Sequence, residues 1–302
     1  MRDTSVIGYL SISLLLILAV YSVKAEQGHI FIAQLTSEGG RSGIGPNPFD
    51  DWEFGENEVT SMGLRQHYLV GYDLSEIYAE SLALDRIYSP WQVNIRSTNH
   101  NATLMCAQSQ LEAIYPPKLR GGLTDNQTAL AVPPGDNTSI KKEIDSLGNN
   151  IMPDNFQTLP IHAMDFDKDT VLMSDWCSKI SEINQRSVND TEWEATLVET
   201  YKADFDVLKT LVGKDTLSVH QIFEYMDSIH ARSFNRESIG VLSGHYENLM
   251  EFRFKYIEKL WSSEDALRLY SNGFTIDLER YFIHFVNLSL LLLKSILTGL
   301  EN

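Results

Sequence analysis

The sequence predicts an α/β fold, with a mainly parallel sheet flanked by helices and followed by a block of helices. Two observations predict it: apolar runs alternate with helical patterns in the first part of the chain, and residues 191–261 show helical periodicity alone. Alternation of strand and helix is typical of layered α/β domains. With 302 residues, 43% of them apolar, the chain can bury the core of one large domain or of a domain with a sizeable insertion, and we expect the second arrangement.

The N-terminus is predicted to be a secretory leader. An apolar stretch runs from Val6 to Val23, and the small residue Ala25 suits cleavage before Glu26. The stretch lies at the lower edge of the roughly 17 to 25 residues that can span a bilayer. Residues 1–25 are therefore a signal peptide, which we favour, or a retained signal anchor, and residues 26–302 form the domain.

The glycosylation signals and the net charge limit the cellular location and the kinds of partner that we expect. Five Asn-x-Ser/Thr sequons begin at Asn101, Asn126, Asn137, Asn189 and Asn287. They are consistent with a glycosylating compartment, so we expect a secreted, lysosomal or vacuolar, or membrane-anchored glycoprotein. The formal net charge of −17 argues against nucleic acid or an anionic membrane surface as a partner, because either would repel the protein.

The region after the leader predicts a strand, a loop and a helix. The apolar run His29–Gln34 suits a buried strand, and the glycine and proline of 39–48 predict a loop. Thr60 or Ser61 can then cap a helix. This helix places Leu64, Tyr68 and Gly71 on one face.

After this helix the sequence predicts two strands and a second helix. Residues 85–89 and 92–96 are predicted strands, and the helix after them is ended by Pro116-Pro117. Its apolar face is formed by Leu104, Ala107, Leu111 and Ile114. Residues 119–153 are predicted to be a long surface loop because glycine, proline, asparagine and aspartate are frequent there.

Helical patterns dominate the second half. Apolar positions at helical spacing include Trp193, Leu197, Tyr201, Phe205 and Leu208. The apolar segment Tyr281–Leu293 is short for a membrane span, so we expect a core helix packed on the sheet. The alternative is a helix that binds a membrane surface or a protein partner.

The two cysteines, Cys106 and Cys177, are too few for a disulfide framework and lack zinc-site spacing. Cys106 lies in a helical pattern and is predicted to be an inert core residue. No metal-ligand cluster is apparent in the sequence, and no cofactor is predicted.

Two segments carry a family resemblance. Residues 59–71 read Val-Thr-Ser-Met-Gly-Leu-Arg-Gln-His-Tyr-Leu-Val-Gly, and 94–117 contain Asn-Ile-Arg-Ser-Thr-Asn-His-Asn-Ala-Thr-Leu-Met-Cys-Ala and end in Ile-Tyr-Pro-Pro. Both resemble the histidine acid phosphatases, secreted and lysosomal phosphomonoesterases. The resemblance covers roughly residues 29–280 and implies a phosphoglycerate-mutase-like fold. It implies a further strand at Phe156–His162 and a helical cap at about 180–262.

The resemblance also implies where the chemistry belongs. The family places an Arg-His-Gly-x-Arg-x-Pro motif after its first strand, and the histidine attacks phosphorus. The matching segment here is Ser37-Glu38-Gly39-Gly40-Arg41-Ser42-Gly43. Glu38 thus stands at the nucleophile position and Ser37 at that of the first arginine. A carboxylate there repels an incoming phosphate.

The remaining candidate residues are those that bind an anion. Arg41 matches the second motif arginine, and Arg96 matches an arginine from a later strand end. Beside the Gly39-Gly40 turn the two arginines can still hold phosphate or another small anion. Alternatively Arg41 pairs with Glu38 and neutralises the site, which we slightly favour.

Three histidines are open to more than one interpretation. His162 matches the family's mid-chain histidine, and it either lines the pocket or is a hydrogen-bonded structural residue. His230 lies in a chance match to the missing motif, and His67 is a packing or surface residue. The family's later His-Asp pair has no match before Asn302.

These observations predict a catalytically inactive family member with a structural, binding or membrane-associated role. A membrane or protein partner would be contacted through Val6–Val23 and Tyr281–Leu293. The alternative is an active secreted or lysosomal acid phosphatase that hydrolyses phosphomonoesters and whose sequence is truncated or misassembled here. The sequence predicts no oligomeric state.

Overall fold

The computed structural model describes residues 31–49, 55–85, 87–117, 121–173 and 177–299. The predicted leader, residues 1–25 with the stretch Val6–Val23, lies outside these ranges. The chain divides into two compact units. One unit contains Gly71–Asn94 and Ala113–Gln157, and the other contains Thr36–Val70, Ile95–Glu112 and the residues from Thr158 onwards. Each unit is described separately below.

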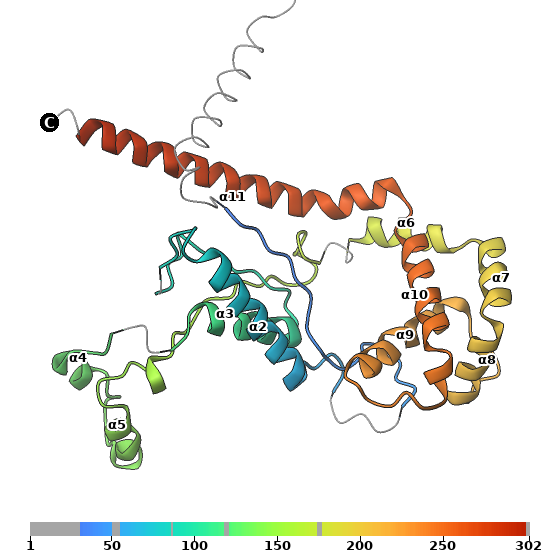
Figure 1. Cartoon of the computed structure of the whole chain (residues 1–302), viewed down its shortest axis with the longest axis horizontal. Coiled ribbons are helices and arrows are strands. Elements are labelled where there is room, and N and C mark those ends of the chain that lie inside the picture. Colours follow the sequence, from blue (N-terminus) through green and yellow to red (C-terminus); the bar gives the residue numbers. More distant parts are fainter. Residues whose placement is uncertain (1–30, 50–54, 86, 118–120, 174–176, 300–302) are drawn as a thin grey trace, which may run out of the picture. The chain divides into compact units, whose positions relative to one another are not determined.

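Helices are the main regular structure of the described residues. They are α2 (Ser61–Tyr78), α3 (Asn101–Ile114), α4 (Asp125–Leu130), α5 (Lys141–Leu147), α6 (Ser178–Val188), α7 (Thr191–Thr200), α8 (Lys202–Leu211), α9 (Val219–Phe234), α10 (Tyr246–Leu260) and α11 (Glu264–Gly299) (Figure 1). Three short 3-10 helices are η1 (Thr138–Ile140), η2 (Pro153–Asn155) and η4 (Gly240–Gly244).

The predicted parallel sheet is not observed in the part of the chain that the structure describes. Residue pairing of the β type is confined there to two isolated bridges, Arg41 with Val59 and Arg96 with His162. The second bridge is parallel and joins two of the predicted strands: the His162 amide donates to Ile95 at 3.0 Å, and the Ser97 amide donates to His162 at 2.9 Å. The pairing that the pattern predicts is therefore present at one point only.

The strand predicted at residues 85–89 is wrong for the residues described there. Ile87 is exposed, and the Tyr88 amide donates to the side chain of Gln157 at 3.3 Å rather than to a neighbouring strand. The Tyr88 ring packs edge-on against Tyr115, with centroids 5.9 Å apart. A short apolar run forms a strand only where a neighbouring strand accepts hydrogen bonds from its amides. Here a side chain is the acceptor for the Tyr88 amide.

Both helices predicted in the first part of the chain are confirmed. Thr60 caps α2, since its Oγ1 accepts a hydrogen bond from the Gly63 amide at 3.2 Å. Helix α3 ends at Ile114 because the residue before a proline disfavours helical backbone and Pro116 follows closely. Ser109 Oγ donates to the Leu64 carbonyl at 2.7 Å and links the two helices.

The loop predicted at residues 119–153 contains short helices. Thr124 accepts from the Gln127 amide while the Gln127 side chain accepts from the Thr124 amide, a capping box that starts α4. None of the residues of α4 or α5 is buried. The composition predicts the exposure of this segment correctly, whereas the helix that begins after Thr124 depends on a capping box that composition does not indicate.

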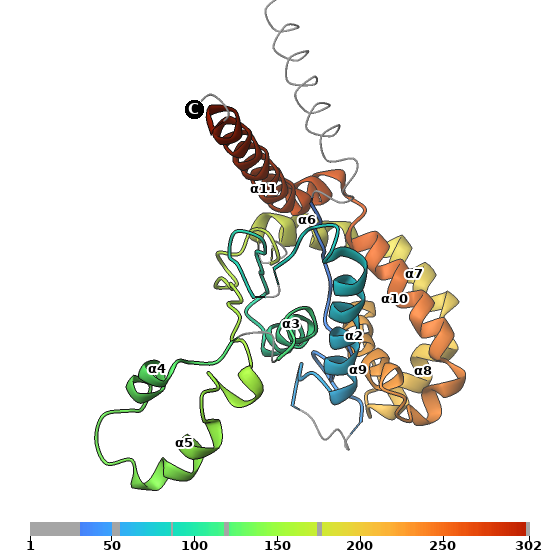
Figure 2. The same cartoon turned by 60° about the vertical axis from the view of Figure 1, so that its left-hand side comes forward.

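In the second unit, α7, α8, α9 and α10 pack around one apolar core (Figure 2). The predicted core positions Leu197, Tyr201, Phe205 and Leu208 are all buried. Phe205 packs edge-on against Phe252 of α10 with centroids 4.9 Å apart. Burying each such side chain stabilises the folded state by about 1.5–3 kcal/mol. The helical periodicity of 191–261 places these side chains on one face of each helix, and it therefore predicts the bundle.

Helix α11 runs well beyond the predicted segment Tyr281–Leu293, which forms part of it. Phe282 and Ile283 are exposed, so the prediction of a core helix is wrong for these two residues. Side chains from His284 onwards lie outside the description. Among the described residues, no helix combines the length and apolar character needed to cross a bilayer.

Gly273 lets α11 approach the loop before α6 closely. A Cβ atom added at Gly273 would lie 2.0 Å from the Thr170 carbonyl oxygen. Gly273→Ala should therefore lower the midpoint temperature of unfolding, although alanine favours a helix by about 1 kcal/mol over glycine. Gly244→Ala is the matched control, because no atom lies within 4 Å of its added Cβ. A thermal scan in which both variants match or exceed the wild type would contradict this packing.

Candidate functional site

Hydrogen bonds within the protein fix the segment that matches the phosphatase motif. The Gly40 amide donates to Gln66 Oε1 at 2.9 Å, and the Gly40 carbonyl accepts from the Thr60 amide at 2.9 Å. A Cβ added at Gly63 would lie 2.1 Å from the Gly40 oxygen, so glycine is required where α2 begins. The amide predicted to cradle an anion at Gly40 is therefore already occupied.

Cys106 and His67 close the other side of this segment. Cys106 of α3 is buried, with 2% of the residue exposed. Burial raises the pKa of the Cys106 thiol, the Gly39 amide opposes this and the charge of Glu38 adds to it, with a net rise. The prediction of an inert core residue is confirmed. His67 is buried on α2 with its Nε2 3.0 Å from the Ser37 carbonyl, which confirms a packing role.

Arg41 pairs with Asp227 of α9, so the predicted pairing with Glu38 is wrong. The guanidinium is bidentate: Nη1 lies 2.8 Å from Oδ2 and Nη2 lies 3.2 Å from Oδ1. Burial lowers the pKa of Arg41, but the hydrogen bond and charge of Asp227 and the charge of Glu38 give a net rise. The negative charge of Glu38 thus raises the pKa of Arg41, although Glu38 is not its ion-pair partner.

Close packing against α9 explains this choice of partner. A Cβ added at Gly43 would lie 2.4 Å from Ser228 Cα, so the loop lies directly on the helix. The Ile44 amide donates to Asp227 Oδ2 at 2.7 Å, and Asn235 Nδ2 donates to the Arg41 carbonyl at 2.8 Å. These contacts bring the Arg41 side chain to Asp227.

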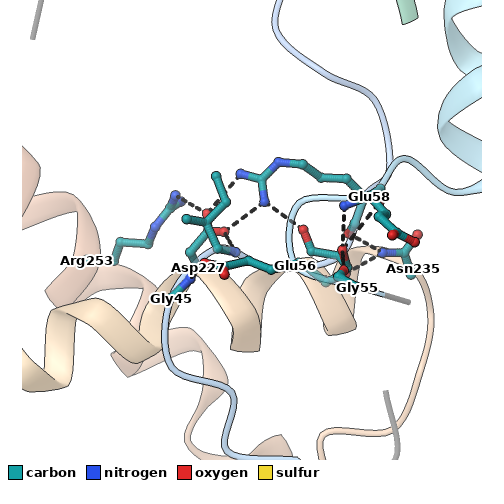
Figure 3. A network of polar contacts seen from close by, with 11 residues as sticks. Gly45, Gly55, Glu56, Glu58, Asp227, Asn235 and Arg253 are labelled. Atoms are coloured by element: carbon teal, nitrogen blue, oxygen red, sulfur yellow. Dashed lines mark hydrogen bonds and ion pairs between the residues drawn. The ribbon is translucent and has the colours of Figure 1, made fainter. Parts of the chain in front are cut away.

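A second arginine approaches the same carboxylate. Arg253 of α10 points toward Asp227, with its Nη2 3.7 Å from Oδ1 (Figure 3). Burial raises the pKa of Asp227, but the hydrogen bond and charge of Arg41, the Ile44 amide and the charge of Arg253 bring it below its ordinary value. The Asp227 carboxyl is therefore ionised between two cations.

His230 belongs to this cluster, although the sequence interpretation treated its motif as a chance match. It lies one helical turn beyond Asp227 on α9, and its Nδ1 is 2.9 Å from the Tyr246 hydroxyl. Burial lowers the pKa of His230, and the charges of Arg253 and Arg41 add to this while Asp227 opposes it. Burial and the two arginine charges thus favour the neutral imidazole of His230.

Arg96 is engaged by a different set of carboxylates. Its Nη2 lies 3.2 Å from Asp169 Oδ1, and its Nη1 pairs with Asp277 of α11. Asp169 is buried and also accepts from the Val171 amide at 3.0 Å. The structure thus gives Arg41 and Arg96 separate acidic partners rather than one shared anion site.

His162 is joined to Arg96 through the backbone alone. The parallel bridge brings the two residues together, and the His162 side chain is exposed. Neither predicted role, a pocket lining or a hydrogen-bonded structural residue, is supported by a side-chain contact in the described part of the chain. Within the same part, no group of three or more His, Cys, Asp or Glu side chains is arranged to hold a metal ion.

Four charged residues of these clusters were missed by the sequence reasoning: Asp169, Asp227, Arg253 and Asp277. The one local signal was the spacing of Asp227 and His230, three apart on a predicted helix, which places both on one face. Of the sequons, Asn101, Asn126 and Asn189 are exposed and Asn137 is partly buried, whereas the side chain of Asn287 lies outside the description. Glycosylation remains a prediction.

Asp227→Asn should destabilise the protein by about 1–3 kcal/mol, because a partly buried guanidinium loses its charged acceptor. The pKa of Asp227 is lowered by folding, so its stabilising effect is present above the unfolded pKa of about 3.9 and is lost as pH falls through the folded value. Urea unfolding at several pH values measures this. A stability difference between wild type and variant that does not shrink at acid pH would contradict the ion pair.

The chain is similar to a known protein family over most of its length. Residues 21–292 match the family model of the histidine phosphatase superfamily (branch 2). The chain is 27% identical over 216 residues to prostatic acid phosphatase of Bos taurus, covering 68% of this chain and 48% of the relative. It is 25% identical to prostatic acid phosphatase of Homo sapiens, covering 66% of this chain and 47% of the relative.

A lysosomal relative gives the same result. Lysosomal acid phosphatase of Xenopus laevis is 22% identical over 237 residues, covering 76% of this chain and 48% of the relative. The chain thus spans about half the length of the curated relatives it matches. Because the family model matches most of the sequence, this chain belongs to the histidine phosphatase superfamily, branch 2.

Proposed function

We propose that this protein is a non-catalytic histidine acid phosphatase with a structural, binding or membrane-associated role. The observation that carries the proposal is that both arginines expected to bind a phosphoryl group are paired with carboxylates. Arg41 pairs with Asp227, and Arg96 pairs with Asp169 and Asp277.

The chemistry expected of the family needs three things that are changed here. It needs a histidine nucleophile, and Glu38 stands at that position. It needs guanidinium groups free to take the phosphoryl oxygens, and carboxylates hold them instead. It also needs a cavity that attracts an anion, whereas Glu38 adds a negative charge beside Arg41.

The proposal also includes a place in the secretory pathway and the predicted α/β sheet. The leader at 1–25 and the sequons favour the secretory pathway, as do relatives named prostatic and lysosomal acid phosphatases. A membrane or protein partner would be contacted through Val6–Val23 and Tyr281–Leu293. The parallel pairing of Arg96 with His162, together with the family, supports an α/β sheet.

The alternative is an active acid phosphatase that hydrolyses phosphomonoesters. The names of the relatives favour it. It requires a nucleophile other than Glu38 and the release of at least one arginine from its carboxylate.

The purified protein should not hydrolyse a chromogenic phosphomonoester at acid pH above the rate of a mock preparation, because the nucleophile is absent. The release of the chromophore is followed by absorbance, with bovine prostatic acid phosphatase as the positive control. Turnover by the wild type that Arg96→Ala abolishes would establish the alternative.

Restoring the two motif residues alone should not restore catalysis. In the double variant Ser37→Arg with Glu38→His, Arg41 and Arg96 remain bound to their carboxylates, so turnover should stay at background. Rapid-quench measurement of a covalent phosphohistidine provides a second readout. A double variant with clear turnover would mean that the internal carboxylates do not block the site.

A further inference from the structure

Lys141 and Lys142 are the one pair of adjacent basic residues in the sequence. Both lie in the first turn of α5, and both are exposed. The Lys141 side chain is 72% exposed, and its Nζ lies 3.2 Å from Oδ1 of Asp145, which is also exposed. Surface ion pairs of this kind fix a side chain only weakly. The two ammonium groups are therefore accessible from solvent.

The backbone around this pair is stabilised by few interactions. Helix α5 has seven residues, and the 3-10 helix η1 directly precedes it. Neither helix has a side-chain hydrogen bond at its N-cap, and neither contains a buried residue. A helix as short as α5 is marginal in water unless packing stabilises it. Residues 138–147 can therefore open locally without exposing any part of an apolar core.

Contacts at the base of the exposed segment keep this opening local. The Leu123 amide donates to the Asn149 carbonyl at 2.7 Å, and a Cβ atom added at Gly122 would lie 2.8 Å from the same oxygen. Gly148, with a φ of +56°, ends α5. Exposed loops of polar residues are preferred sites of proteolytic cleavage. The segment between Leu123 and Asn149 thus meets the structural requirements of a protease substrate.

We propose that Lys141–Lys142 is a processing site for a serine endoprotease of the class that recognises paired basic residues. Such an enzyme binds its substrate as an extended segment and holds the two ammonium groups with carboxylates. Water adds across the peptide bond between Lys142 and Glu143: its hydroxyl joins the Lys142 carbonyl carbon, and its other hydrogen goes to the Glu143 nitrogen. The inference rests on the proposed function only because the secretory pathway would bring the chain to such a protease.

Cleavage at this site gives two pieces that contacts elsewhere in the protein hold together. The ion pair of Arg41 with Asp227 joins a residue before the cut to a residue after it. So does the hydrogen bond from the His162 amide to the Ile95 carbonyl, at 3.0 Å. The buried residues of the core that α7–α10 form, Leu197 to Tyr256, all follow the cut. Both cysteines of the chain are free, so the pieces are not joined by a disulfide.

The test is limited digestion of the purified full chain by a subtilisin-type endoprotease that requires paired basic residues. Any N-glycans are removed first, because a glycan at Asn137 would lie close to the pair. A denaturing gel without reductant should show two fragments, and the second fragment should begin at Glu143 by N-terminal sequencing. Gel filtration of the cleaved protein should give the elution volume of the intact chain, and thermal unfolding of the α7–α10 bundle should be unchanged.

Matched variants separate the recognition of the basic pair from its accessibility. Lys142→Gln should abolish cleavage, whereas Lys142→Arg keeps the pair and should still be cleaved. Position 142 is exposed, so neither change should impair folding. Thr210→Lys, combined with Lys142→Gln, creates a basic pair with Lys209 on α8, where Phe205 and Leu208 are buried. This double variant should resist the protease, because opening α8 would expose the core.

The proposal is overturned if the folded wild type stays intact while the same chain, unfolded beforehand in urea, is cut at the pair. It is also overturned if Lys142→Gln is cleaved as fast as the wild type, or if the pair on α8 is cleaved as readily as the native pair. Fragments that separate during gel filtration would contradict the two-chain form. Turnover of a phosphomonoester, or a chain that cells retain rather than secrete, would contradict the proposed function and leave the result of the digestion unchanged.

Discussion

The ion pair between Arg41 and Asp227 fixes the relation between the motif loop and the helical bundle. Its two nitrogen–oxygen contacts, with the Ile44 amide and the close approach at Gly43, hold the loop on α9. Both side chains are largely shielded from solvent, so the pair is weakened less by salt than an exposed pair would be. Breaking it would leave a partly buried charge without an acceptor.

The same arrangement recurs around Arg96, where carboxylates also come from distant parts of the sequence. Asp169 lies in a loop and Asp277 on α11, whose approach depends on Gly273. In both cases a carboxylate occupies a guanidinium fork that also fits a phosphoryl group. At both of the arginines that the family resemblance singles out, carboxylates of the described residues thus bind the guanidinium.

The helices were predictable because their signals are local. The Thr60 cap, the prolines after Ile114 and the periodicity of Leu197 to Leu208 act within a few residues. The partner of Arg41 was not predictable, since Asp227 is distant in sequence and Glu38 is near. The packing of Gly43 on Ser228 and the hydrogen bonds of Ile44 and Asn235 bring Arg41 to Asp227, and a single sequence contains no record of these contacts.

The strands were predicted less well because pairing requires a second segment. The apolar run at 85–89 has the right composition but donates the Tyr88 amide to a side chain. His162 and Arg96 do pair, and both lie in segments that were predicted to be strands. Arg41 and Arg96 could be named from the sequence as candidates, whereas their carboxylate partners lie in distant segments that carry no motif.

A double-mutant cycle between Arg41 and Asp227 tests the central interaction most directly. The free energy of unfolding is measured for the wild type, Arg41→Gln, Asp227→Asn and the double variant. The ion pair predicts a coupling energy of about 1–3 kcal/mol that decreases in acid as Asp227 becomes protonated. A coupling energy near zero at neutral pH would contradict it.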